Sequence, residues 1–192
     1  RKGREALAEV PKAVAVSNRT GNENFLIQQM RASAALVAGD YNAAIKAYES
    51  LLGSGRLSRA EQTTAVKTVA DLYYREKNYG KAARWYTRYF KEGGTDQSAK
   101  TFQLQSHYLS NDCANVSRMV GTESRAGEEE LQMLANCYLR LNDNGGYVST
   151  IERLVVQYPK KQYWTDLLAR VQKKPGFSHP LVLVLYRLRF AT

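Results

Sequence analysis

The stretch RASAALVAGDYNAAIKAYESLL, residues 31–52, decides the fold that the sequence predicts. Gly39 ends a first helical pattern, because glycine readily takes the left-handed conformation that closes a helix, and Asp40 can cap the next one. Apolar residues of the second helix fall on one stripe, namely Ala44, Ile45, Tyr48 and Leu51. The stretch therefore predicts two helices joined by a tight polar turn.

Three further segments repeat this design, at residues 69–90, 104–120 and 134–159. Their turns carry Asn78-Tyr79, Asn111-Asp112 and Asn142-Asp143 in place of Gly39-Asp40. The equivalent positions Ala44, Ala82, Val116 and Tyr147 are spaced by 38, 34 and 31 residues. These spacings bracket the ~34-residue period of the tetratricopeptide repeat, which the segments resemble.

The sequence thus predicts an all-α, right-handed solenoid of antiparallel helix pairs, with four to five repeats. Residues 1–20 are expected to form an N-terminal capping helix and linker, and residues 21–192 the repeat domain, continuing beyond the end of the chain. Residues 162–172 would begin a fifth pair, and a last apolar helix would start at Pro180. A non-repetitive helical bundle is the alternative, which four copies in register disfavour.

Composition limits the function without naming it. The formal net charge of +10 favours an acidic partner: an anionic protein face, a membrane surface or a nucleic acid. Cys113 and Cys137 are too few for a disulfide framework, and they could form one disulfide or remain two buried thiols. No metal site is expected from two cysteines and two histidines without metal-ligand spacing. No apolar run reaches the length of a spanning helix.

No enzyme signature is present in the sequence. It lacks the glycine-rich phosphate loops, the HExxH zinc motif and the GxSxG nucleophile elbow. The carboxylates of residues 128–130 precede a helical pattern, where they favour the positive end of the helix dipole. We therefore expect no catalytic residue and no cofactor.

A partner-binding groove is the expected functional site, because the first helix of each repeat lines the concave side of such arrays. Register places in it Gln29, Ser33, Lys67, Asp71, Tyr74, Arg75, Gln105, Tyr108, Gln132, Asn136 and Arg140. Amides can bond a peptide backbone, aromatic rings grip side chains, and arginines hold acidic groups. The sequence therefore predicts a non-catalytic scaffold that binds an extended protein segment. The carboxylate clamp of the family is not reproduced, since Asp71 follows Lys67 where an amide is needed.

Two alternatives use other surfaces. A basic stripe of Lys81, Arg84, Arg88 and Lys91 could bind RNA or another polyanion. Trp85 coincides with the packing face, which disfavours base stacking and hence nucleic acid. The apolar C-terminal helix could instead pair between chains, which would make the protein an oligomerisation module.

Two longer segments resemble one particular group of tetratricopeptide proteins. These are residues 24–45 and residues 130–192, the latter containing LANCY and YPKKQYW. The segments are similar to proteobacterial proteins that carry a signal peptide and accompany TonB-type energy-transduction systems. This resemblance implies a periplasmic or envelope-associated scaffold, with a TonB/ExbB-type component or an outer-membrane receptor as partner. It carries over no catalytic residue.

Overall fold

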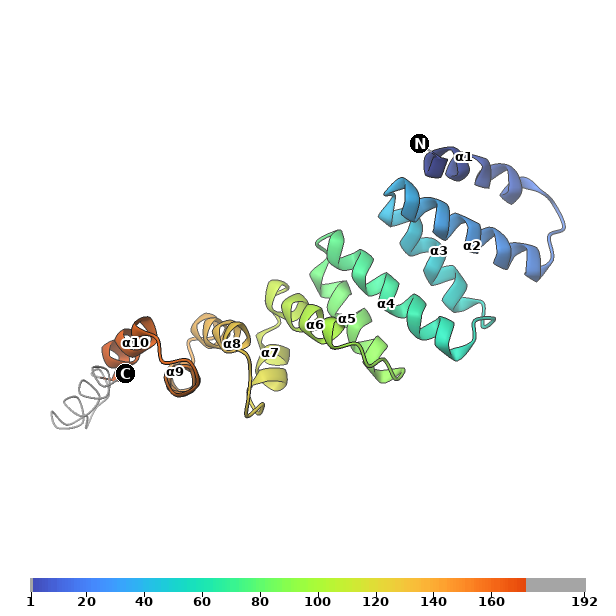
Figure 1. The fold of residues 1–192 in the computed structure, drawn as a ribbon. Coiled ribbons are helices and arrows are strands. Elements are labelled where there is room, and N and C mark those ends of the chain that lie inside the picture. Colours follow the sequence, from blue (N-terminus) through green and yellow to red (C-terminus); the bar gives the residue numbers. More distant parts are fainter. Residues whose placement is uncertain (1, 172–192) are drawn as a thin grey trace. The chain divides into compact units, whose positions relative to one another are not determined.

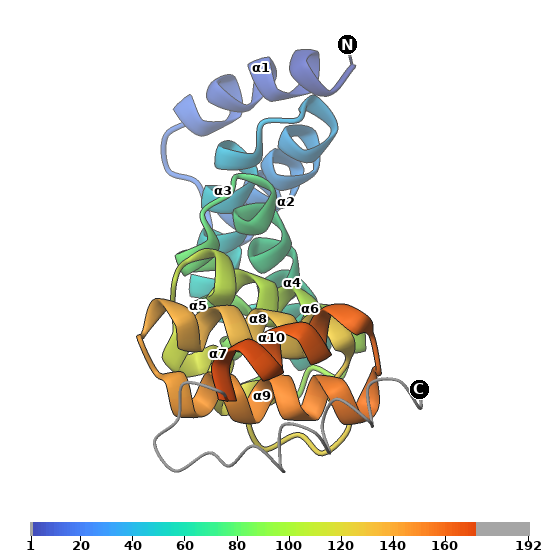
Figure 2. The same cartoon turned by 90° about the vertical axis from the view of Figure 1, so that its left-hand side faces the viewer.

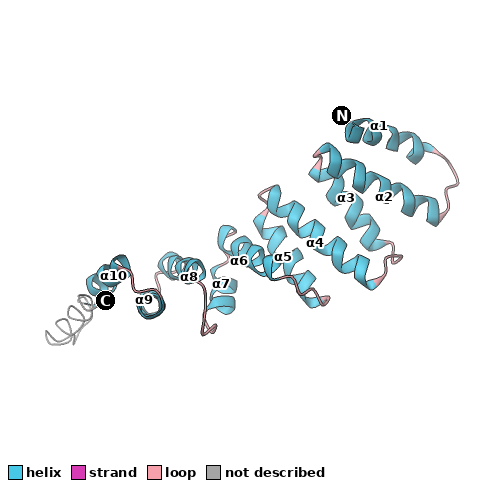
Figure 3. Cartoon of the chain, in the orientation of Figure 1, coloured by secondary structure: helices cyan, strands magenta, loops and turns pink. Residues whose placement is uncertain are grey.

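The computed structural model describes residues 2–171, and this part of the chain contains ten helices and no strand (Figures 1 and 3). The helices are α1 (Lys2–Ala15), α2 (Gly21–Ala38), α3 (Tyr41–Gly53), α4 (Arg59–Arg75), α5 (Tyr79–Lys91), α6 (Gln97–Leu109), α7 (Cys113–Val120), α8 (Glu128–Arg140), α9 (Asn144–Gln157) and α10 (Lys161–Val171). The predicted all-α class is confirmed. The helix predicted from Pro180 lies outside the described residues.

The turn inside each helix pair has the same construction four times. A residue with positive φ ends the first helix, and an Asp or Asn side chain then accepts the backbone N–H three residues later. The pairs of residues are Gly39-Asp40, Lys77-Asn78, Asn111-Asp112 and Asn142-Asp143. Because Asn and Gly tolerate the left-handed region and Asp and Asn cap helices, the sequence fixes where each second helix begins.

Capping boxes start two of the first helices. Thr20 with Glu23 begins α2, and Ser58 with Glu61 begins α4. In each box the hydroxyl accepts the N–H of the glutamate while the carboxylate accepts the N–H of the cap residue. These contacts satisfy amide groups that no helical carbonyl can reach.

The described helices fall into two compact units, α1 to α6 and α7 to α10. The sequence predicts a cap at 1–20 and one repeat domain at 21–192. Helix α1 lies in the first unit and packs along α2. Small side chains let the helices of this unit approach closely, and Ala35, Ala44, Ala70, Ala82 and Ala99 have no exposed surface.

The second unit contains α7 to α10. Helix α9 packs against both α8 and α10, and it lies on the same side of the two in both views (Figures 1 and 2). The core of the second unit includes Leu131, Leu134 and Leu154, each no more than 1% exposed. A disulfide joins Cys113 at the start of α7 to Cys137 in α8. Of the two alternatives left open by the sequence, the structure contains the disulfide.

Candidate peptide-binding grooves

Helices α2 and α4, each the first helix of its pair, line an open cavity of about 390 Å³ in the first unit, with α3 beneath them. We call it the α2–α4 cavity. Its lining residues are Gln29, Ala32, Ser33, Tyr48, Leu51, Leu57, Ala60, Glu61, Thr64, Ala65 and Thr68. Two of the residues expected in the groove, Gln29 and Ser33, therefore lie where a ligand could reach them.

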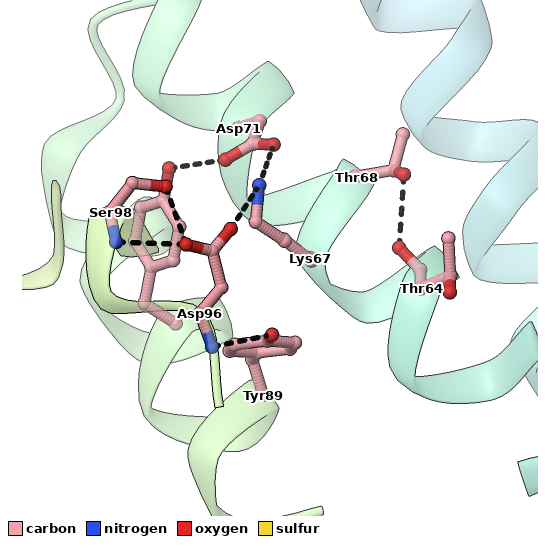
Figure 4. Close-up of polar contacts among 8 residues, drawn as sticks. Thr64, Lys67, Thr68, Asp71, Tyr89, Asp96 and Ser98 are labelled. Carbon is pink, nitrogen blue, oxygen red and sulfur yellow. Dashed lines mark hydrogen bonds and ion pairs between the residues drawn. The ribbon is translucent and has the colours of Figure 1, made fainter. Parts of the chain in front are cut away.

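Hydroxyl groups and apolar side chains dominate the α2–α4 cavity. Thr64 donates to the Ala60 carbonyl at 2.9 Å, and Thr68 donates to the Thr64 carbonyl at 3.0 Å, the bond drawn in Figure 4. Both hydroxyl oxygens keep lone pairs as acceptors. Glu61 is the charged lining residue, and one of its oxygens is held by the Ser58 N–H and hydroxyl. The cavity thus has polar rims and an apolar floor.

A second cavity, of about 290 Å³, lies in the second unit between α8 and α10, with α9 beneath. We call it the α8–α10 cavity. It is lined by Gln132, Ala135, Asn136, Tyr147, Ile151, Leu154, Gln162, Tyr163 and Asp166. Gln132 donates to the Tyr163 hydroxyl at 2.6 Å, and Tyr147 donates to Asp166. Two more expected groove residues, Gln132 and Asn136, therefore line this cavity.

The two cavities occupy equivalent places in the repeat. Each is formed by two successive first helices over one second helix. Six residues of one lining have a counterpart in the other at an interval of 103 positions, among them Gln29 with Gln132, Ser33 with Asn136, and Leu51 with Leu154. The same arrangement of helices thus recurs in both units, with polar residues at the positions of Gln29 and Ser33 in each.

Between α4 and α6 the equivalent place is occupied by an ion-pair network (Figure 4). Lys67 contacts Asp71 at 3.1 Å and Asp96 at 3.4 Å. Asp71 also accepts the Tyr86 hydroxyl at 2.6 Å, and Asp96 accepts both the N–H and the hydroxyl of Ser98. Lys67 and Asp71 were expected to face a partner. The structure shows that they bond to each other and to neighbouring helices.

This network perturbs the ionisable groups in it. Burial lowers the pKa of Lys67, but its hydrogen bonds to Asp71 and Asp96 outweigh burial and leave that pKa raised. Burial, followed by the hydrogen bond to Asp71, raises the pKa of Tyr86 well above its ordinary value. Lys67 is therefore a cation and Tyr86 a neutral donor at neutral pH.

Acid is expected to lower the melting temperature through carboxylates at the helix starts. Hydrogen bonds from Ser58, Ser98 and Lys160 depress the pKa values of Glu61, Asp96 and Glu128, respectively. A depressed folded-state pKa gives stability that is present above the ordinary carboxyl pKa of about 4 and lost as the pH falls through the folded value. Melting curves by circular dichroism between about pH 6 and pH 3 measure this loss.

Glu61→Gln supplies the matched comparison, because glutamine can keep the cap hydrogen bond without carrying a titrating group. Its melting temperature is expected to vary less with pH than that of the parent chain. The same slope in both proteins would contradict the assignment of acid sensitivity to this cap.

The remaining expected residues lie near the turns or between first helices. Tyr74 donates its hydroxyl to Gln105 at 2.8 Å, linking α4 to α6. Arg75 lies over the Tyr41 ring, 5.8 Å from its centroid. Arg140 contacts Asn111 at 3.3 Å, at the turn before α7. Tyr108, half-buried on α6, lines neither cavity.

Sequence reasoning missed the other wall of each cavity. Thr64 and Thr68 line the α2–α4 cavity, and Tyr163 and Asp166 line the α8–α10 cavity. A first helix inside a stack has two flanks, one toward the preceding groove and one toward the following groove. The predicted groove residues belong to the flank toward the following groove. The helical interval of four between Thr64 and Thr68 is the sequence signal that indicates the flank toward the preceding groove.

The basic stripe on α5 makes local contacts. Lys81 lies over the Tyr73 ring at 5.1 Å, and Arg88 lies over the Trp85 ring at 5.0 Å. Arg88 also pairs with Glu92 at 2.6 Å. The Trp85 ring stacks on Tyr73 within the protein. These rings are therefore used in packing, where a single-stranded nucleic acid would need them exposed.

No group of three or more His, Cys, Asp or Glu side chains in the described part of the chain could hold a metal ion. Within residues 2–171, every helix is too short or too polar to cross a membrane.

No protein-family model and no curated protein matches this sequence. Among solved structures, the crystal structure of MamA protein aligns over 88% of this chain and 92% of that chain, with 11% identity and a TM-score of 0.52. The TPR2AB domain of yeast Sti1, in a structure described as a pHSP90 complex, aligns over 98% and 70%, with 16% identity and a TM-score of 0.47. A tetratricopeptide repeat protein from Parabacteroides merdae aligns over 98% and 78%, with 16% identity and a TM-score of 0.42.

The likeness to MamA concerns the fold alone. The other two structures have TM-scores below 0.5, too low to support a conclusion about this chain. The recurring turns, the paired helices and this likeness agree on one architecture. The chain has an all-α, tetratricopeptide-repeat-like solenoid fold.

Proposed function

We propose that this protein is a non-catalytic scaffold that binds an extended segment of a partner protein between its first helices. The observation that carries the proposal is the recurrence of one open cavity at equivalent places in both units. Amide and hydroxyl groups at the rims can bond a peptide backbone, while the apolar floors accept side chains. None of this requires a catalytic group.

The proposal includes a location in an oxidising compartment, the periplasm or cell envelope of a Gram-negative bacterium. The Cys113–Cys137 disulfide supports this location, because such bonds persist in oxidising compartments and are rare in the reducing cytosol. A component of TonB-type machinery as partner rests on the resemblance of residues 24–45 and 130–192 alone.

Site-specific photo-crosslinking in cells tests the proposal. A benzophenone amino acid replaces Ser33 or Asn136, both exposed at a cavity rim, and control chains carry it at Lys46 or Glu152, which are exposed on second helices. We expect adducts with the same partner protein from the two rim positions and none from the controls. Nuclease treatment should leave the adducts unchanged, whereas a polyanion partner would make them nuclease-sensitive.

A filled cavity provides the matched comparison. Thr64→Trp should lower the yield of the Ser33 adduct by roughly tenfold, as loss of a central binding contact does. Arg59→Trp places the same ring on α4 outside the cavity and should leave the yield unchanged. Adducts that form equally at control positions, or that survive Thr64→Trp, would contradict groove binding.

A further inference from the structure

The α2–α4 cavity and the α4–α6 site, which holds the ion-pair network, are related by a shift of 38 residues. Gln29, Ser33 and Tyr48 at the first site correspond to Lys67, Asp71 and Tyr86 at the second. In the second site, Asp71 bonds both Lys67 and Tyr86, so the polar groups satisfy one another.

At the first site the two rim positions carry no charge, and the tyrosine has no equivalent acceptor. Within the described part of the chain, no side chain or carbonyl forms a hydrogen bond with the Tyr48 hydroxyl, although Tyr48 lines the cavity. Burial raises the pKa of Tyr48, so its hydroxyl stays protonated and can donate at neutral pH. A half-buried donor that faces a cavity is suited to a ligand that brings its own acceptor.

We propose that the α2–α4 cavity binds an uncharged stretch of extended polypeptide, with a backbone carbonyl accepting the Tyr48 hydroxyl and an aliphatic side chain resting on the floor. The inference rests on the proposed function and specifies its ligand at one site. Leu51, Leu57, Ala60 and Ala65 form the apolar surface that would contact the side chain.

The charge around the cavity determines which segments it accepts. Glu61 is the one charged residue among those that line it, and its carboxylate is fixed at the start of α4 by Ser58. The lining offers no cation to an acidic ligand, so a negatively charged segment would be desolvated beside Glu61 without a partner. An acidic segment was one partner that the basic composition favoured. The cavity itself is complementary to an uncharged one.

Three blocked tripeptides that differ in one side chain test this selectivity, namely acetyl-Ser-Leu-Ser-amide and its Asp and Lys counterparts. Each is titrated into the ¹⁵N-labelled full chain while backbone amide shifts are followed. The leucine peptide is expected to shift the amides of Gln29, Thr64 and Thr68 at millimolar concentrations. The aspartate peptide should bind at least about tenfold more weakly, and the lysine peptide should lie between them.

Two variants test the role of Tyr48. Ser33→Asp copies the arrangement of Asp71 with Tyr86, so the new carboxylate should accept the Tyr48 hydroxyl and weaken binding of the leucine peptide by at least about tenfold. Tyr48→Phe removes the donor and should weaken binding of the same peptide roughly fivefold, the effect of one neutral hydrogen bond. Ser50→Asp, on the exposed side of α3, introduces the same charge outside the cavity and should leave binding unchanged.

Tighter binding of either charged peptide at this cavity, or no shift of its amides by the leucine peptide, would overturn the inference. Full binding to Ser33→Asp would also overturn it. The proposed function is judged separately, by the partner adducts at Ser33 and Asn136. If those adducts form while the tripeptides show no selectivity, the scaffold function stands and the uncharged ligand does not.

Discussion

Reducing the Cys113–Cys137 disulfide is expected to lower the free energy of unfolding of the second unit by about 3 kcal/mol. The bond joins α7 to α8 across 24 residues of chain. Closing a loop of this length removes conformations from the unfolded chain, which stabilises the folded state relative to it. Helix α7 has only eight residues and depends on packing against α8, so it gains most from the link.

The two tryptophans allow each unit to be followed by its own fluorescence. Trp85 belongs to the first unit and Trp164 to the second, so Trp85→Phe and Trp164→Phe each leave one reporter. In urea, reduction should move the Trp164 transition to lower concentration by roughly 2 M, given the slopes usual for units of this size. The Trp85 transition should stay in place.

A chain without the bond provides the control for the reductant itself. Cys113→Ala/Cys137→Ala should unfold as the reduced parent does, and the reductant should not change it further. A Trp164 transition at the same urea concentration before and after reduction would show that the disulfide adds no stability. Equal shifts of both tryptophans would show that the effect is not confined to the second unit.

The helix pairs could be predicted because their turns are encoded by short-range chemistry. Gly39-Asp40 and Asn142-Asp143 each place a residue that tolerates positive φ before a residue that caps a helix. Lys77 also takes a positive φ, at 57°, although lysine does not favour it. Here the following Asn78 cap and the packing of α4 on α5 impose the conformation, and the sequence showed only the cap.

The groove could be predicted only in part, because register assigns a residue to a face without giving its neighbours. Gln29, Ser33, Gln132 and Asn136 do line the cavities. Lys67 has the same register as Gln29, yet it meets Asp96, which comes from the connection to the next repeat. The pairing of Cys113 with Cys137 likewise depends on how two helices pack, which no spacing rule specifies.

Removing the carboxylate of Asp71 is expected to cost the first unit about 2 kcal/mol of unfolding free energy, because it leaves the buried Tyr86 hydroxyl without its acceptor. The Tyr86 residue is 1% exposed, and Asp71 accepts its hydroxyl at 2.6 Å. Lys67 would retain Asp96 at 3.4 Å, so the loss in Asp71→Ala falls mainly on the tyrosine. Urea unfolding followed by Trp85 measures it.

A double-mutant cycle separates this hydrogen bond from other effects of the substitution. Tyr86→Phe removes the donor and keeps the ring, so Asp71→Ala should cost less in that background, by about 1 to 2 kcal/mol. Equal costs in the two backgrounds would show that the pair contributes nothing specific. The result also bears on the α2–α4 cavity, because Asp71→Ser reproduces Ser33 at the α4–α6 site. If that variant frees the Tyr86 hydroxyl to bind the leucine tripeptide, one rim residue decides whether a site of this solenoid packs against itself or accepts a ligand.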